Sequence, residues 1–217
     1  IIAASVAMSS DLAQRCKGAG VPIVLFNRRQ EGQEFSAVTS NNREGGRLVA
    51  DFLCRGGHQR IAHIAGWEGA STQVDRERGF RDGLAAAAQT LFAREIGNFS
   101  IDEAREAARR MFTAADRPDA VFVSNDHMAF GVMDVLRSEL GLSVPGDVSV
   151  VGYDDVPPAA WAAYDLTTVR QRANRMVEET VDILLKQIER PDTPARAVAV
   201  EAPLIVRGSA RIPQGWT

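Results

Sequence analysis

The feature that most constrains the fold is a pattern that recurs along the chain. A short run of apolar, mostly β-branched residues is followed by a polar or glycine-containing turn and then by a longer stretch with helical spacing. The apolar runs lie at 1–4, 23–26, 61–65, 121–123 and 148–151. Continuous apolar strands are typical of parallel sheets that helices cover on both faces. The alternation therefore predicts an α/β protein with parallel sheets.

The stretches between the strands carry ordinary helix signals. Helices are predicted at 9–19, 43–55, 75–88, 102–114, 127–140 and 171–189. Gly56 and Gly141 follow two of them, where glycine commonly ends a helix. The last helix has a wide apolar stripe, which we assign to core packing rather than to a membrane.

Composition excludes several classes of protein. The 217 residues are 45% hydrophobic and 24% charged, enough to bury a sizeable core. No stretch approaches the roughly 18 consecutive apolar residues of a membrane span. A net charge of −3 and a pI near 5.7 argue against a nucleic-acid-binding surface in these residues, because phosphate binding needs a basic face. We therefore expect a globular protein without a membrane segment, and any contact with DNA must come from elsewhere.

Polar side chains gather where the predicted strands end. Ligands of open parallel sheets bind beyond the carboxyl ends of the strands. Asn27 and Arg28 follow one strand, and Arg76 lies in the predicted first turn of a helix. The candidate ligand-binding residues from this pattern are Asn27, Arg76, Asn125 and Asp154, with Phe99 and Trp161 as aromatic platforms. Amides, a carboxylate, a guanidinium and rings suit a small polyhydroxylated or heterocyclic ligand.

Each candidate also has a structural interpretation. Asn125 and Asp126 can cap the helix that follows them. Asp154 can belong to a solvated turn, and Phe99 and Trp161 can be core residues. A cation near a helix N-terminus is electrostatically disfavoured, so a specific partner is expected for Arg76.

Motifs for catalysis and for metals are absent from the sequence. It contains no GxxxxGK[ST], GxGxxG, GxSxG or HExxH string. His58, His63 and His127 lack metal-ligand spacing, and Cys16 and Cys54 have no CxxC partner. We therefore expect no enzyme activity, no metal and no cofactor, and assign these side chains to structural roles.

Six short strings occur in order along most of the chain. They are GHQRIAHIAG at 57–66, RERGF at 76–80, SNDHMAFG at 124–131, VPGDVSVVGYDD at 144–155, LTTVRQ at 166–171 and VRGS at 206–209. Together they resemble the regulatory core of the lactose-repressor/galactose-repressor family of transcription factors. The sequence differs from the family pattern at Asn41, where many relatives have aspartate, and before Leu166, where proline is usual.

The resemblance implies a periplasmic-binding-protein-like fold of type I. Two Rossmann-like parallel-sheet lobes would be joined by three crossovers, with an effector in the cleft between them. The N-terminal lobe would hold 1–40 and 170–195, the C-terminal lobe 41–169 and 196–210, and 211–217 would form a tail. The first strand-helix units of the N-terminal lobe are expected to be missing, so this lobe would be incomplete.

The resemblance also implies a function. Its effector contacts map onto Asn27, Asn41, Arg76, Phe99, Asn125 and Asp154. It implies a sugar-like small-molecule effector, homodimers, a cytoplasmic location and operator DNA binding through a headpiece that this chain lacks. Asp154 and Arg76 would grip hydroxyls or a carboxylate through charge-assisted bonds.

Two other functions stay open. A periplasmic sugar-binding protein of a transporter shares the same fold. An enzyme acting on nucleotide sugars or phosphosugars is a third interpretation, weakened by the missing motifs. The residues name neither the effector nor its effect on DNA binding.

Overall fold

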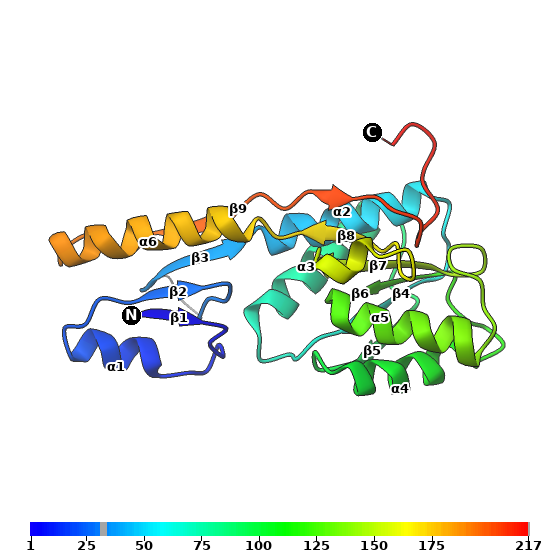
Figure 1. Cartoon of the computed structure of the whole chain (residues 1–217), viewed down its shortest axis with the longest axis horizontal. Coiled ribbons are helices and arrows are strands. Elements are labelled where there is room, and N and C mark those ends of the chain that lie inside the picture. The colour runs from blue at the N-terminus through cyan, green and yellow to red at the C-terminus, as the bar shows by residue number, and fades with distance from the viewer. Residues whose placement is uncertain (31–33, 217) are drawn as a thin grey trace.

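The computed structural model describes residues 1–30 and 34–216. They form two α/β lobes, each built around its own sheet, as Figure 1 shows. The chain passes from one sheet to the other three times. This architecture agrees with the predicted two-lobed fold with three crossovers.

The first lobe contains a parallel sheet in the order β1-β2-β3-β9. Because side chains alternate across a strand, adjacent residues of β2 face opposite helices. Leu25 packs in a small core with α1, whereas Val24 packs in another with α6. The elements are β1 (Ile2–Ala4), α1 (Leu12–Gly18), β2 (Val24–Phe26), β3 (Ser36–Ser40), α6 (Ala173–Glu189) and β9 (Ala197–Val200).

The second lobe contains a six-stranded sheet in the order β10-β8-β7-β6-β4-β5, parallel except for β10 at its edge. Helices α4 and α5 cover one face, and α2 and α3 cover the other. The elements are α2 (Asn42–Arg55), β4 (Ile61–Ala65), α3 (Ser71–Ala86), β5 (Ala93–Ile96), α4 (Ile101–Phe112), β6 (Ala120–Val123), α5 (Asp126–Asp134), the π-helical η1 (Val135–Glu139), β7 (Ser149–Asp154), the 3₁₀ turn η2 (Pro157–Ala160), β8 (Thr167–Arg170) and β10 (Leu204–Ile205).

Two glycines bring α2 and α3 together backbone to backbone. A Cβ at Gly79 would lie 1.8 Å from the carbonyl oxygen of Arg43, and a Cβ at Gly46 would lie 2.1 Å from that of Arg76. Any side chain at either position would force the helices apart. This close approach places the start of α2 beside Arg76.

The apolar stripe of α6 is only partly buried. Met176, Thr180 and Ile183 are buried, but the stripe also includes four exposed residues. These are Val177, Val181, Leu185 and Ile188. The predicted role in core packing therefore holds for one side of the stripe. In the described residues, no helix has both the length and the apolar character needed to cross a membrane.

One predicted boundary is wrong. Residues 196–210 are predicted in the second lobe, but β9 pairs in parallel with β3 of the first sheet, with Ala37 opposite Ala197. β9 thereby gives partners to backbone groups of β3 that would otherwise form an open edge. The third crossover follows β9, at 201–203, and the other two lie at Asn41 and at 171–172.

Other differences concern short or mixed segments. Five strands are not predicted from the sequence, because they are short or only partly apolar. They are β3, β5, β8, β9 and β10. Helix α3 begins at Ser71 rather than at 75, after an extended Ala70. Arg76 is therefore the sixth residue of this helix and not part of its first turn.

Candidate ligand site between the lobes

Arg76 is the centre of a buried polar cluster at the carboxyl ends of β6 and β7. Its Nε donates to Asn42 Oδ1 over 2.9 Å, and its Nη1 donates to the Ser124 carbonyl over 2.5 Å. Its Nη2 donates to Asp154 Oδ1 over 3.2 Å. The guanidinium carbon lies 3.6 Å from the centroid of the Tyr153 ring, and the side chain is only 3% exposed. Arg76 thus joins the first residue of α2 to the ends of two strands.

Asp154 lies at the end of β7, beside a crossover. Its Oδ1 also accepts a hydrogen bond from Gln171 Nε2 over 2.6 Å, and Gln171 belongs to the segment that leads into the first lobe. Burial raises the pKa of Asp154, and Arg76 opposes this effect. The neighbouring Asp155 is not a solvated turn residue, because it is bound by Arg207 over 2.6 Å and by Arg170.

The first lobe contributes Asn27 and Arg28, directly after β2. Asn27 has a φ of 67°, and its backbone N–H donates to the Val38 carbonyl over 2.8 Å. Its Oδ1 is buried and has no hydrogen-bond partner among the described residues. Arg28 Nη1 donates to the Ser5 carbonyl over 3.0 Å, while its Nε is buried without a partner in the same part of the chain. Both side chains therefore keep unused hydrogen-bonding capacity.

Arg28 reaches the second lobe through two aromatic rings. Its guanidinium carbon lies 5.6 Å from the centroid of the Phe99 ring and 5.8 Å from that of the Trp67 ring. Phe99 has a φ of 60°, and its ring covers Gly66, where a Cβ would lie 2.3 Å from the ring. Burial, and then the charge of Arg76, lower the pKa of Arg28. Phe99 therefore forms an aromatic surface between the lobes.

Three predicted site residues lie outside this cluster. Asn41 caps α2 by accepting from the Glu44 N–H, and Asn125 caps α5 by accepting from the Met128 N–H over 3.0 Å. Trp161 follows η2 and is 59% exposed. Its backbone forms hydrogen bonds with Pro158, Tyr164 and Asp165 near η2. The structure therefore joins Arg76 to Asp154 and places Phe99 against Arg28, the residue after Asn27. Asn41 and Asn125 cap helices directly beside Asn42 and Ser124, which are two hydrogen-bond partners of Arg76.

Asp126 does not cap α5, because Asn125 holds the cap position. Its carboxylate is instead buried, accepting from Thr168 Oγ1 over 2.6 Å and from the Val156 N–H over 2.9 Å. Burial raises the pKa of Asp126 to about 7, although these two hydrogen bonds oppose the shift. Asp126 is therefore a titratable group inside the second lobe.

A second polar network lies behind the cluster. Gln73 Oε1 accepts from the Gly66 N–H over 2.6 Å and from the Ser124 hydroxyl. The Gln73 amide lies 3.3 Å from Nε2 of the buried His63 and donates to Glu77 over 2.9 Å. Burial lowers the pKa of His63 to about 4. Gln73 therefore fixes both Gly66 under Phe99 and Ser124 beside Arg76.

The histidines and cysteines provide no metal site in the described residues. No group of three or more His, Cys, Asp or Glu side chains in them has the arrangement of metal ligands. Cys16 and Cys54 are free thiols. His58 and His63 are buried in the second lobe.

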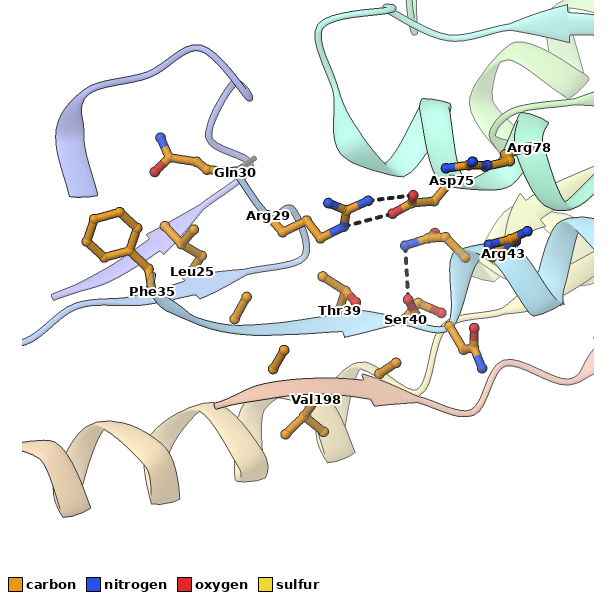
Figure 2. Close-up of a pocket in the computed structure, with 15 residues that line it drawn as sticks. Leu25, Arg29, Gln30, Phe35, Thr39, Ser40, Arg43, Asp75, Arg78 and Val198 are labelled. Atoms are coloured by element: carbon orange, nitrogen blue, oxygen red, sulfur yellow. Dashed lines mark hydrogen bonds and ion pairs between the residues drawn. The ribbon is translucent and has the colours of Figure 1, made fainter. Parts of the chain in front are cut away.

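A cavity of about 370 Å³ opens between the two lobes (Figure 2). Its walls include Leu25 and Thr39 from the first lobe, and Asn42 and Arg78 from the second. The ion pair of Arg29 and Asp75, 2.7 Å long, crosses from one lobe to the other at this cavity. Of the predicted site residues, Asn41 alone lines it. The cavity and the Arg76 cluster are neighbours because Asn42 belongs to both.

Sequence reasoning missed several residues of this region. Asn42 and Gln171 each bind a member of the cluster, and Trp67 faces Arg28. Asn42 and Gln171 lie at crossovers, where the chain has no periodic pattern. An aromatic residue in the loop after a strand was the available signal for Trp67.

Similarity to known proteins agrees with this geometry. Residues 50–210 match the family described as "Periplasmic binding protein-like domain". The chain is 34% identical over 212 residues to the HTH-type transcriptional repressor PurR of Vibrio vulnificus, covering 94% of this chain and 63% of the repressor. It therefore spans a little under two thirds of the length of this curated relative.

Two solved structures extend the comparison to three dimensions. A complex of the transcriptional regulator CelR with cellobiose has a TM-score of 0.89 at 34% identity, with 96% of this chain and 64% of that chain covered. A LacI transcriptional regulator from a Rhodococcus species has a TM-score of 0.87 at 30% identity, covering 98% of this chain and 78% of that one. These relatives favour a regulator over the transporter and enzyme alternatives. The chain belongs to the periplasmic binding protein-like family and, within it, to the LacI family of transcriptional regulators.

Proposed function

We propose that this chain is the effector-binding core of a transcriptional regulator. It binds a small, sugar-related molecule between its lobes and thereby controls how a DNA-binding headpiece, carried on a longer form of the protein, holds operator DNA. The observation that carries the proposal is the Arg76 cluster, which reaches the crossover residue Gln171 through Asp154, together with the separate contact of Arg28 with Phe99 between the lobes. A cluster with spare hydrogen-bonding groups at a lobe boundary suits a polar ligand.

The proposed contacts follow from the chemistry of each side chain. Arg76 and Asp154 hold ligand hydroxyls through charge-assisted hydrogen bonds. Asn27 uses its unpartnered Oδ1 as an acceptor, and Phe99 packs against the apolar face of a sugar ring. Asn41, Asn125 and Trp161 stay predictions, as contacts that form at the rim of the site.

The proposed mechanism is a population shift between two lobe arrangements. A ligand that touches both lobes binds one arrangement better than the other, and the difference in affinity sets the size of the shift. The three crossovers are the segments about which the lobes can turn. Asp154 and Gln171 flank one crossover, so ligand contact there is coupled directly to lobe position.

The proposed partners and location follow from this role. A sugar-sized effector is supported by the similar CelR structure, which contains cellobiose. Operator DNA is contacted through the headpiece, because the present chain has a net charge of −3 and a pI near 5.7. We further propose that the full regulator is a homodimer and acts in the cytoplasm, where its DNA is.

A thermal-shift screen tests the proposal. The purified chain is heated with cellobiose, other neutral sugars, sugar acids, sugar phosphates and nucleosides. A ligand at a hundred times its Kd stabilises the folded state by about 2.7 kcal/mol, a shift that such a screen detects. A specific rise in Tm with one class supports the proposal. A flat profile over the whole panel, with a folded protein, contradicts it.

A further inference from the structure

Arg28 has an unusual environment for a charged side chain. Its guanidinium extends from the first lobe to the rings of Phe99 and Trp67 in the second. Its only hydrogen bond within the described residues goes to a backbone carbonyl, that of Ser5, and its buried Nε has no partner there. Arg28 is half-buried, and removing part of a cation from water is unfavourable unless an acidic group compensates it.

No described carboxylate compensates Arg28. Asp154, the acidic residue of the cluster, is already bound to Arg76 and Gln171. Asp75, the acidic residue on the adjacent part of α3, is bound by both Nε and Nη2 of Arg29. Among the described residues, Arg28 therefore has no acidic partner. The pKa of Arg28 is lowered first by burial and then by the charge of Arg76, with no acidic residue among the causes.

The surroundings of Arg28 offer further features that attract negative charge. Helix α3 starts next to it, and the backbone N–H of Arg29 donates to Ser71 at that start. The N-cap residue Ala70 has no side-chain hydrogen bond to give, and no acidic residue occupies the first turn. The positive end of this 16-residue helix is thus not neutralised by its own side chains.

We propose that the interlobe site selects ligands that carry an anionic group, a carboxylate or a phosphate, on a body of sugar size, and that Arg28 is the residue that pairs with this group. The inference rests on the proposed function of the cleft. The two rings hold the plane of the guanidinium, while its N–H edge can form a fork with two ligand oxygens. Because Nε is covered in the present arrangement, the lobes separate at the Arg28 contact to admit the ligand.

Isothermal titration calorimetry with matched ligands tests the inference. The 217-residue chain is titrated with glucose, glucuronate and glucose 6-phosphate, then with galactose, galacturonate and galactose 6-phosphate, and with cellobiose as a further neutral ligand. We expect one anionic member to bind at least about 10-fold tighter than its neutral counterpart, as a charge-assisted contact allows. Tighter binding by the carboxylates or by the phosphates identifies which anion the site takes.

Variants of Arg28 separate the charge from other effects. Arg28→Gln is expected to weaken anionic binding about 10-fold or more and to change neutral binding less than twofold. Arg28→Lys keeps the charge and is expected to retain part of the anion preference. Arg175→Gln, an exposed arginine on α6, changes the net charge equally and is expected to have no effect. Circular dichroism tests whether each variant folds. If Arg28→Gln does not fold, the anion preference of Arg28→Lys and the salt dependence of anion binding test the role of Arg28 instead.

The outcomes distinguish this inference from the proposed function. If a neutral sugar binds as tightly as its anionic counterpart, or if the anion preference survives in Arg28→Gln, the anion inference is wrong and the effector-binding core stands. The same holds if a nucleoside or cellobiose is the sole ligand found. If no compound in either panel binds to the folded chain, both proposals are wrong.

Discussion

Arg76 Nη2 lies 3.2 Å from Asp154 Oδ1, so a buried guanidinium on α3 and a carboxylate at the end of β7 hold one another at the boundary of the two lobes. Each of the two residues forms a further hydrogen bond. Arg76 also binds Asn42 at one crossover, and Asp154 also binds Gln171 at another. Two of the three crossovers are therefore tied through a single ion pair. A ligand that replaces part of this pairing changes both crossovers at once.

Replacing Asp154 by asparagine tests this pair. Asp154→Asn keeps the shape of the side chain but removes the charge that binds Arg76 and that, in the proposed function, binds ligand hydroxyls. We expect ligand affinity to fall about 10-fold or more, because charge-assisted hydrogen bonds are the stronger class. Calorimetry with a ligand found in the screen measures the loss. Asp134→Asn, at an exposed pair on α5, is the control, and unchanged affinity in Asp154→Asn would remove Asp154 from the site.

The contact between α2 and α3 predicts a stability difference between two glycine variants. Gly79→Ala places a methyl group 1.8 Å from the Arg43 carbonyl oxygen, whereas Gly18→Ala at the end of α1 has no atom within 4 Å. Overpacking a core costs about 1–3 kcal/mol. We therefore expect Gly79→Ala to lower the free energy of unfolding by about 1–3 kcal/mol or more. Gly18→Ala is expected to be neutral or slightly stabilising. Urea denaturation measures both, and equal stability of the two variants would contradict the close approach.

The central strands of the fold could be predicted from the sequence because they are buried and continuously apolar. The runs at 61–65 and 121–123 became β4 and β6 at the centre of the second sheet, where both faces are covered. Strand β9 could not be predicted in the first lobe. Its alternating exposed and half-buried residues give a weak signal, and its pairing with β3 joins segments far apart in the chain.

The candidate site could be predicted only in part. Asp154 ends a buried run, so the rule that ligands bind beyond strand ends locates it. Arg76 is predicted in the first turn of a helix but is the sixth residue of α3, so that rule does not locate it. Asn42 and Gln171 lie at crossovers and were missed, since no local pattern shows which distant residue they bind. The capping role of Asn125 was equally compatible with the sequence, and the choice depends on a hydrogen bond to Met128.

The buried carboxyl of Asp126 predicts a particular pH dependence. Its pKa in the folded state is raised from 3.8 to about 7, chiefly by burial. The folded state therefore holds a proton that the unfolded state releases, and the contribution of Asp126 to stability is fully present below pH 3.8. This contribution is lost as the pH rises through about 7. Above that pH, Asp126 is ionised in both states and no longer changes the free energy of unfolding with pH.

Comparison with Asp126→Asn isolates this effect. The pKa of His63 is lowered to about 4, so His63 contributes stability at high pH that is lost as the pH falls, opposing Asp126 in the same range. Subtracting the free energy of unfolding of Asp126→Asn from that of the wild type at each pH removes the His63 contribution. We expect this difference to fall between pH 4 and 7. A difference that is flat or rises with pH would show that Asp126 is ionised in the folded state.

The ion pair of Arg29 and Asp75 predicts how easily the lobes separate. It joins the loop after β2 to α3, while the Met8 N–H donates to the Gly69 carbonyl across the same boundary over 3.1 Å. Asp75→Asn is expected to favour the open arrangement and to speed hydrogen exchange of the Met8 amide. Because partly exposed pairs contribute about 0.2–1 kcal/mol, the acceleration should not exceed about fivefold.

The matched control for Asp75→Asn is Asp82→Asn. Asp82 binds Arg43 with similar geometry, at 2.7 Å, but this pair joins α2 to α3 within one lobe. Its loss is expected to leave exchange at Met8 unchanged, since it changes no contact between the lobes. High salt should reduce the difference between wild type and Asp75→Asn, because screening weakens exposed pairs. Equal exchange in all three proteins would show that other contacts hold the lobes together, with the Arg28 contact to Phe99 and Trp67 as the next to test.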